Sequence, residues 1–208
     1  MIEIYASSDG DSHIVLEDGE AHGQIIVIGV NTVHAISDTG KTGIALFVDP
    51  LSACGYSLSS HILQGRAYAS VSADISLSRE MTGTEKIRKI SEEILQVLQG
   101  DPVPCPFHET VSKTIALINE EDCTYRMEDI AKQVYLSKSR LAHVFSEETG
   151  ITLKEYLLYK RLERACRKIL DGTSITDAAY ETGYAGSSHI AVSSIRLTGM
   201  ALRKMLGL

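Results

Sequence analysis

Apolar residues follow two different patterns along the chain, and one replaces the other near residue 100. Up to residue 79 they occur in short runs, such as residues 24–30 and 43–48, that are separated by Gly, Asn and Asp. Such runs are typical of strands joined by turns, and residues 38–41 predict one of these turns. We therefore expect a small β-rich domain at the N-terminus.

A single amphipathic helix is predicted over residues 84–99, where apolar residues recur at steps of three and four. Thr84 is a suitable N-cap, and Gly100 ends the pattern. A stripe with the spacing of a coiled-coil seam consists of Ile87, Ile90, Ile94 and Val97. The helix therefore either pairs two subunits through this stripe or packs the stripe on the β-sheet of its own chain.

Three prolines among the five residues 102–106 exclude a helix interior and predict a stiff linker. We therefore expect an N-terminal domain over residues 1–100, a linker over residues 101–106 and a C-terminal domain over residues 107–208. The predicted fold class is α+β, because the pattern after Phe107 is helical throughout.

The C-terminal domain contains an internal repeat. Its first unit aligns with its second at an offset of 48 residues, and at 49 residues in the later elements. The aligned segments are 127–134 with 175–182, 141–142 with 190–191, and 149–151 with 198–200. Each unit reads as a short helix, a tight turn and a second helix, which is the pattern of a helix-turn-helix.

A long helix is predicted between the two units, over residues 153–170. Thr152 and Glu155 form a capping box before it, and Asp171 and Gly172 end it. Its apolar stripe consists of Tyr156, Leu157, Leu162, Ala165, Cys166, Ile169 and Leu170. Its basic residues either touch phosphates or only keep the surface solvated; they are Lys160, Arg161, Arg164, Arg167 and Lys168.

Composition excludes several classes of protein. With 208 residues, 44% hydrophobic and 23% charged, the chain is neither disordered nor fibrous. It has no apolar run long enough to span a membrane and no signal-peptide layout, so we expect a cytoplasmic protein. The cysteines have neither zinc-site nor disulfide spacing and are interpreted as buried thiols; they are Cys54, Cys105, Cys123 and Cys166.

Charge is divided unequally between the two halves. Residues 1–125 hold 7 Lys and Arg against 18 Asp and Glu, whereas residues 126–208 hold 13 against 9. The basic segment is the one that contains the repeat, which favours a polyanion as its partner.

The second helix of the first unit has the residues that a DNA-recognition helix needs. Ser137 is its N-cap, and Leu141, Val144 and Phe145 face inward. Small and donor side chains then face outward, and we take them as candidate DNA contacts; they are Lys138, Ser139, Arg140, Ala142 and His143. An isolated helix of this kind is more often a solvated surface helix, but the repeat favours recognition.

Several segments resemble the DNA-binding domain of the AraC-type (AraC/XylS) transcription regulators. They are residues 127–131, 136–145, 148–156 and 161–165. The resemblance covers residues 107–208 and implies two helix-turn-helix units whose recognition helices enter successive major grooves. It also implies that Ser139, Arg140 and His143 face the bases.

The second unit departs from the family pattern. It keeps residues 174–179 and Gly183, but residues 190–194 replace the family's usual Phe-x-Arg-x-Phe, so that an arginine and a core aromatic are missing. Ser187 and Ser188 are the candidate DNA contacts near the start of this helix, together with His189. They either make weak, positional contacts or merely cap the helix.

The N-terminal half resembles the family's cupin-like sensor at residues 26–36 and 46–50. The resemblance implies a homodimer and a small-molecule effector, although the domain is short and offers little room for a ligand. We expect double-stranded DNA as partner, no cofactor and no membrane.

Three other functions are suggested by parts of the sequence. A cupin-type metal enzyme would need a histidine cluster, but His13, His22, His34 and His61 include no close H-x-H pair. A phosphate-binding loop at residues 40–42 is excluded because Ala35 stands at the required upstream glycine. A protein that inhibits other regulators without reading DNA stays open. We predict a sequence-specific DNA-binding transcription regulator that is not an enzyme and has no metal site.

Overall fold

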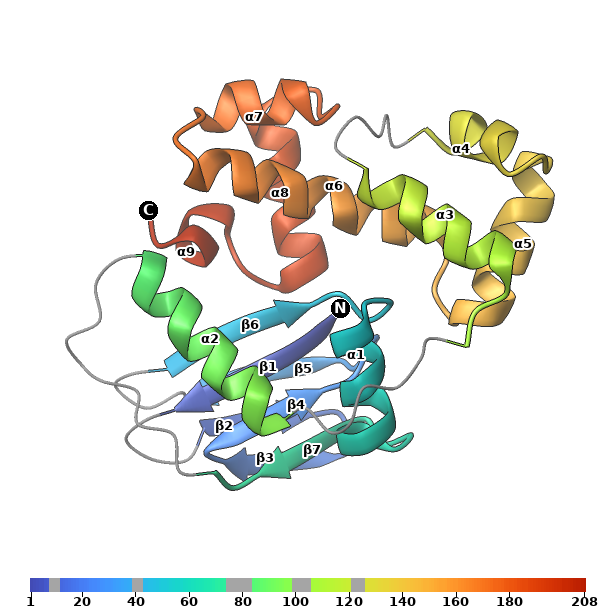
Figure 1. Ribbon diagram of the computed structural model, residues 1–208. Coiled ribbons are helices and arrows are strands. Elements are labelled where there is room, and N and C mark those ends of the chain that lie inside the picture. The colour runs from blue at the N-terminus through green and yellow to red at the C-terminus, as the bar shows by residue number, and fades with distance from the viewer. Residues whose placement is uncertain (8–11, 39–42, 74–83, 99–105, 121–125) are drawn as a thin grey trace. The chain divides into compact units, whose positions relative to one another are not determined.

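The computed structural model describes residues 1–7, 12–38, 43–73, 84–98, 106–120 and 126–208. The chain divides into two compact units, Met1–Cys105 and Pro106–Leu208. The first holds an antiparallel β region and the second is helical (Figure 1), which confirms the α+β fold class.

The N-terminal unit contains two antiparallel sheets. The first has the strand order β6-β1-β4-β7 and the second the order β3-β2-β5. The strands of the first sheet are β1 (Ile2–Ser7), β4 (Ile25–Ile28), β6 (Gly43–Val48) and β7 (Tyr68–Val71). Those of the second are β2 (Ser12–Leu16), β3 (Gly19–Gly23) and β5 (His34–Asp38).

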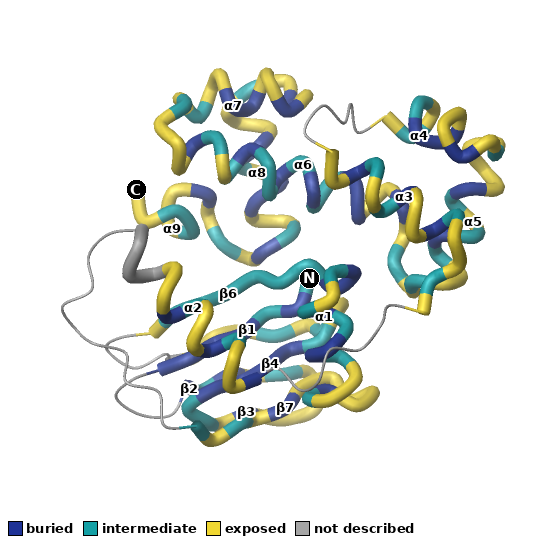
Figure 2. The backbone as a smooth tube through the Cα atoms, viewed as in Figure 1, coloured by how far each residue is buried: buried dark blue, intermediate teal, exposed yellow. Residues whose placement is uncertain are grey.

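Strand β4 is buried along its whole length because both faces of its sheet are covered (Figure 2). Ile25 and Val27 pack in one apolar cluster with residues of β1 and of the helices. Ile26 and Ile28 point the other way and pack with Ile14 of β2. The apolar run that the sequence predicts as a strand is therefore the central layer of the domain.

Helix α2 (Thr84–Leu98) completes this core. Ile90, Ile94 and Leu98 are 5% exposed or less and belong to the cluster that contains Ile2 and Ile4 of β1. A coiled-coil seam through Ile90 and Ile94 is therefore wrong, because these side chains are occupied by the chain's own sheet. Val97, the fourth residue of the predicted stripe, is 48% exposed and lies outside the buried cluster. The side chain of Ile87 lies outside the described residues.

Two short helical segments, α1 (Ala53–Ser57) and η1 (Leu58–Leu63), pack on the same cluster as α2, α1 through Cys54 and η1 through Leu58 and Leu63. Gly55 is required in α1, because a Cβ atom there would lie 2.1 Å from the Asp49 carbonyl oxygen. The first unit is thus a layer of helices, a four-stranded sheet and a three-stranded sheet.

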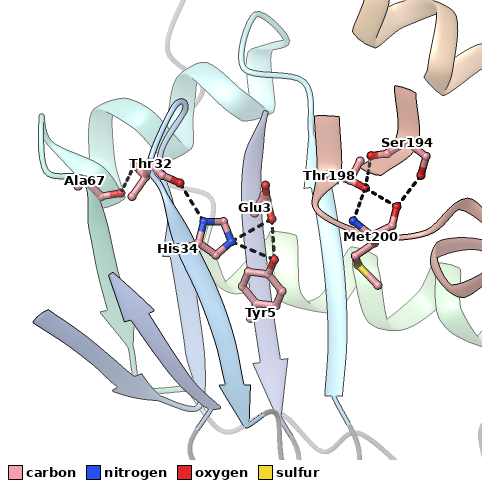
Figure 3. Close-up of polar contacts among 8 residues, drawn as sticks. All are labelled: Glu3, Tyr5, Thr32, His34, Ala67, Ser194, Thr198 and Met200. Carbon is pink, nitrogen blue, oxygen red and sulfur yellow. Dashed lines mark hydrogen bonds and ion pairs between the residues drawn. The ribbon is translucent and has the colours of Figure 1, made fainter. Parts of the chain in front are cut away.

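A polar cluster lies between the two sheets (Figure 3). The Tyr5 hydroxyl of β1 donates to the Glu3 carboxylate at 2.6 Å, and His34 Nε2 of β5 lies 3.4 Å from the same carboxylate. His34 Nδ1 donates to the Thr32 carbonyl at 2.9 Å. The hydrogen bond to Glu3 raises the pKa of His34, and burial raises the pKa of Tyr5.

The C-terminal unit contains seven helices within its described residues. They are α3 (Glu109–Asn119), α4 (Met127–Gln133), α5 (Lys138–Thr149), α6 (Leu153–Leu170), α7 (Ile175–Glu181), α8 (Ser187–Thr198) and α9 (Leu202–Leu206). Helix α6 packs against α3, α5, α7 and α8. It therefore joins two helical clusters within one unit.

Helix α6 has the bounds that the sequence predicts. Thr152 Oγ1 accepts from the Glu155 amide and donates to the Glu155 carboxylate, so the two residues interact as a capping pair. Five residues of the predicted stripe are buried, and Cys166 is half-buried. Leu170, at 55% exposed, is not part of the core, because the helix ends there.

Several sequence predictions fall outside the described residues: the linker at 101–105, the turn at 39–41, the loop at 40–42, Cys105 and Cys123. Cys54 and Cys166 are free thiols, and burial raises the pKa of Cys166 to about 11. In the described part of the chain, the helices are too short or too polar to cross a membrane.

Candidate nucleic-acid interface

The two helix-turn-helix units have the same backbone plan. Helices α4 and α7 have 7 residues each, and α5 and α8 have 12 each. In both turns a residue with positive φ, Tyr135 or Gly183, follows the first helix. The next amide donates to the matching carbonyl, Leu136 to Ala131 and Tyr184 to Ala179.

The second helices also end alike. Thr149 Oγ1 donates to a carbonyl one turn earlier and accepts from the Ile151 amide at 3.2 Å. Thr198 Oγ1 makes the same pair of bonds and accepts from the Met200 amide at 3.1 Å (Figure 3). Each helix then stops at a glycine with φ near 70°, which glycine adopts most readily. The repeat is therefore structural as well as sequential.

In α5, the Ser137 side chain caps the helix by accepting from the Arg140 amide at 3.2 Å. Leu141 and Phe145 are fully buried, and Phe145 packs on Tyr156 of α6. This packing holds the opposite face toward solvent. The exposed members of the predicted contact set are Lys138, Ser139, Arg140 and His143, while Ala142 is half-buried beside them.

The donors on α5 differ in their availability. Lys138 Nζ lies 2.6 Å from the Glu128 carboxylate of α4, and this pairing lowers the pKa of Glu128. His143 Nε2 lies 3.6 Å from Glu147. Within the described residues the Arg140 guanidinium has no partner. Arg140 is therefore the donor that is free to reach a base edge.

Helix α8 presents a different surface at the matching positions. Its N-cap residue is Gly186, and no side chain caps the helix. Ser187 and Ser188, in its first turn, are exposed. The His189 ring packs edge-on against Tyr184, with centroids 5.4 Å apart. Val192 and Ile195 are 65% and 55% exposed.

The core aromatic that α8 lacks is replaced by a buried hydroxyl. Ser194 is fully buried, and its Oγ donates to the Met200 carbonyl at 2.8 Å (Figure 3). The surrounding cluster contains Tyr184, Ile190 and Leu202. In the second unit, a hydrogen bond from Ser194 thus holds the second helix at the position where Phe145 packs in the first unit.

Most basic side chains of α6 serve the packing of their own unit. Lys160 is buried and pairs with Glu163 at 2.5 Å, and Arg167 pairs with the same carboxylate. Arg164 donates to the Glu120 carbonyl after α3, and Lys168 pairs with Glu181 of α7. Lys160 and Arg167 thus pair within α6, while Arg164 and Lys168 bind groups beside α3 and on α7, so these four side chains already have partners inside the unit.

The four histidines considered for a metal site lie apart, with one exception. His34 lies in the polar cluster between the sheets and His61 is exposed on η1. His13 and His22 lie opposite each other on β2 and β3, with Glu20 beside them. In the sequence, His13 and His22 lie at equal distances from the turn at residues 17–18, so a hairpin places them opposite each other although they do not form an H-x-H motif.

Comparison with known proteins identifies one domain and the fold. Residues 130–207 match the family model of a helix-turn-helix domain. No curated protein matches the sequence. The chain is similar in fold to ToxT from Vibrio cholerae O395, with 15% identity, a TM-score of 0.57 and coverage of 99% of this chain and 88% of ToxT.

A second ToxT structure, with bound unsaturated fatty acid, has 15% identity, a TM-score of 0.54 and coverage of 99% and 86%. A smaller similarity is to the C-terminal domain of AraT from Geobacillus stearothermophilus, with 18% identity, a TM-score of 0.44 and coverage of 49% and 87%. The family match lies on the two units described above, and the whole-chain likeness includes the β region. The chain therefore contains a helix-turn-helix domain over residues 130–207 and shares the fold of ToxT over nearly its whole length.

Proposed function

We propose that this chain is a DNA-binding transcription regulator of the AraC type and that it recognises its operator mainly through α5. The observation that carries the proposal is the outward face of that helix, where Ser139, Arg140 and His143 are exposed and the Arg140 guanidinium has no partner within the described residues. Arginine reads guanine in the major groove through two hydrogen bonds. Lys138 and Ala142 border this face and complete the proposed contact surface.

Helix α8 makes mostly positional contacts in this proposal. Ser187 and Ser188 can donate to phosphates, but Val192 stands where a long donor would reach a base edge and has no hydrogen-bonding group. The protein then acts without catalysis and works in the cytoplasm, where its operator is accessible.

The N-terminal unit is proposed to bind a small-molecule effector and to contribute to a homodimer. The support for an effector is the fold similarity to ToxT, of which one structure holds an unsaturated fatty acid and another (E)-4-(8-methylnaphthalen-1-yl)but-3-enoic acid. A dimer would use a surface other than the Ile90 and Ile94 stripe, since that stripe is buried in the domain core.

Recovery and sequencing of DNA fragments bound to the protein in the cell tests this function. The expected result is one enriched block that loses its enrichment when Arg140→Ala is introduced. Absence of any enriched sequence for the wild-type protein would contradict operator binding.

A second function has one observation in its favour. The apolar side chains of Val192 and Ile195 lie exposed on the helix that should read DNA, which suits a protein partner better than a base pair. A protein that binds and inhibits another regulator would use this face. It would retain its inhibitory effect with Arg140→Ala and lose it with a charge at Val192, which separates the two functions.

A further inference from the structure

The hairpin formed by β2 and β3 brings three potential metal ligands together on one face. His13 and His22 are register partners across the hairpin, so their side chains leave the sheet on the same side. Glu20 lies two residues before His22 and shares that face. Ile14 and Ala21 point to the other face and are buried in the core between the sheets. The three polar side chains therefore project from the outer face of the domain.

The contacts within this group converge on one carboxylate oxygen. Glu20 Oε2 lies 3.1 Å from His13 Nε2 and 3.5 Å from His22 Nε2. The two imidazole rings are stacked, with centroids 4.3 Å apart and planes 9° from parallel. All three ligand atoms lie within 4.8 Å of one another.

Hydrogen bonding does not account for the arrangement. The His13 Nε2 atom is buried and makes no hydrogen bond to any of the described residues, although Glu20 Oε2 is only 3.1 Å away. A buried polar atom without a hydrogen bond is unfavourable, because it has lost its contacts with water and has gained none in their place. An ion beside Glu20 Oε2 would satisfy it once the two stacked rings turn so that their in-plane Nε2 lone pairs meet at the ion.

The spacing also suits a transition metal. Ligand atoms at about 2.0–2.2 Å from a tetrahedral zinc ion are separated from each other by about 3.3–3.6 Å. The observed nitrogen–oxygen distances of 3.1 and 3.5 Å are close to this range. Two imidazoles and one carboxylate leave a position for water, and imidazole favours Zn²⁺ over Mg²⁺ and Ca²⁺.

We propose that His13, Glu20 and His22 form a binding site for a divalent transition metal, and that the ion bound there is Zn²⁺. The ion would fasten β2 to β3 from outside, across the pair of strands that holds all three ligands. This site is independent of the DNA contacts proposed for the helical unit, and it lies on the opposite face of the second sheet from the Glu3–Tyr5–His34 cluster.

The test measures Zn²⁺ binding to the full chain by calorimetry and follows its thermal unfolding with and without the ion. One equivalent is expected to bind and to raise the unfolding midpoint. Glu20→Gln and the His13→Ala, His22→Ala double variant should each weaken binding by at least about tenfold. Two matched controls should leave it unchanged: Glu17→Gln, an exposed carboxylate of the same hairpin, and His61→Ala, an exposed histidine of η1.

Cobalt substitution distinguishes this site from the cysteines. Bound Co²⁺ should show visible absorption without the near-ultraviolet charge-transfer band of a thiolate ligand. Glu20→Gln retains the size of the side chain, so it tests the site even if the double variant fails to fold. The proposal is overturned if Zn²⁺ binds Glu20→Gln as tightly as the wild type, if the thiolate band appears, or if Mg²⁺ stabilises the chain equally.

Discussion

The two helix-turn-helix units share a backbone and differ in the surface that it presents. Helices of equal length, the same turn bonds and the same threonine-to-amide closure recur at an interval of 48 or 49 residues. At the matching positions of the second helices, however, His143 is replaced by Val192 and Arg140 by His189. Turns and helix ends are therefore alike in the two units, while the exposed positions of their second helices differ.

The units also differ in how their second helices are anchored. Phe145 fills the core of the first unit, whereas Ser194 occupies the matching position and closes on the Met200 carbonyl. An apolar anchor is favourable through burial, and a buried hydroxyl is favourable only while its acceptor is in place. The comparison therefore predicts different sensitivities to substitution.

The largest expected effect is on stability. Phe145→Ala should reduce the free energy of unfolding by about 3–5 kcal/mol, because it leaves a cavity against Tyr156. Ser194→Ala should reduce it by only about 0.5–1.5 kcal/mol, the net value of one hydrogen bond. Urea unfolding followed by far-ultraviolet circular dichroism measures both. Equal losses for the two variants would mean that the anchors are equivalent.

The next effect concerns operator binding. Arg140→Ala and His143→Ala should each weaken binding to a selected operator by about 1–3 kcal/mol, with little change on unrelated DNA. Val192→Ala is the matched control in α8 and should leave the affinity unchanged. Fluorescence anisotropy with both DNAs gives the two affinities. If Val192→Ala weakens binding as much as His143→Ala, both helices contribute alike.

A gain of function sharpens the same contrast. Val192→Arg supplies a donor at an exposed position of α8 and should create a preference of about 1 kcal/mol at bases one helical turn from the first block. Val192→Gln, without the charge, is its control. A site selection with each variant measures the preference. Uniformly tighter binding to every DNA would instead show that the introduced guanidinium touches only phosphate.

The smallest effect concerns the ion pair between Lys138 of α5 and Glu128 of α4. Among the described residues, α8 has no such pair with α7. Glu128→Gln should release Lys138 and steepen the dependence of log affinity on log salt concentration by about 0.9, the value for one additional phosphate contact. Sequence preference should not change. Adding Lys138→Gln to this variant should remove the increase, and an increase that persists would assign it to another cation.

Local patterns determined most of the helical unit. The bounds of α6 follow from the Thr152–Glu155 pair and from Asp171 and Gly172, because capping groups act on residues adjacent in sequence. The two units were visible as a repeat. Helical spacing identified Leu141 and Phe145 as buried residues of α5, whereas Val144, predicted with them, is only half-buried. The α+β class came from the change of hydrophobic period near residue 100.

Contacts between distant segments were decided by the tertiary structure alone. Periodicity identifies the apolar stripe of α2 but cannot say whether a second subunit or the chain's own sheet covers it, and here Ile90 and Ile94 are covered by β1. Lys138 meets Glu128 only because α4 and α5 pack together. Since Lys138 is paired in this way, Arg140 is left as the free long donor on α5. His13, Glu20 and His22 converge because strand register places positions nine residues apart directly opposite each other. The sequence by itself determined elements and their apolar faces, since these depend on neighbours along the chain, and the tertiary structure decided which partner each face and each charge meets.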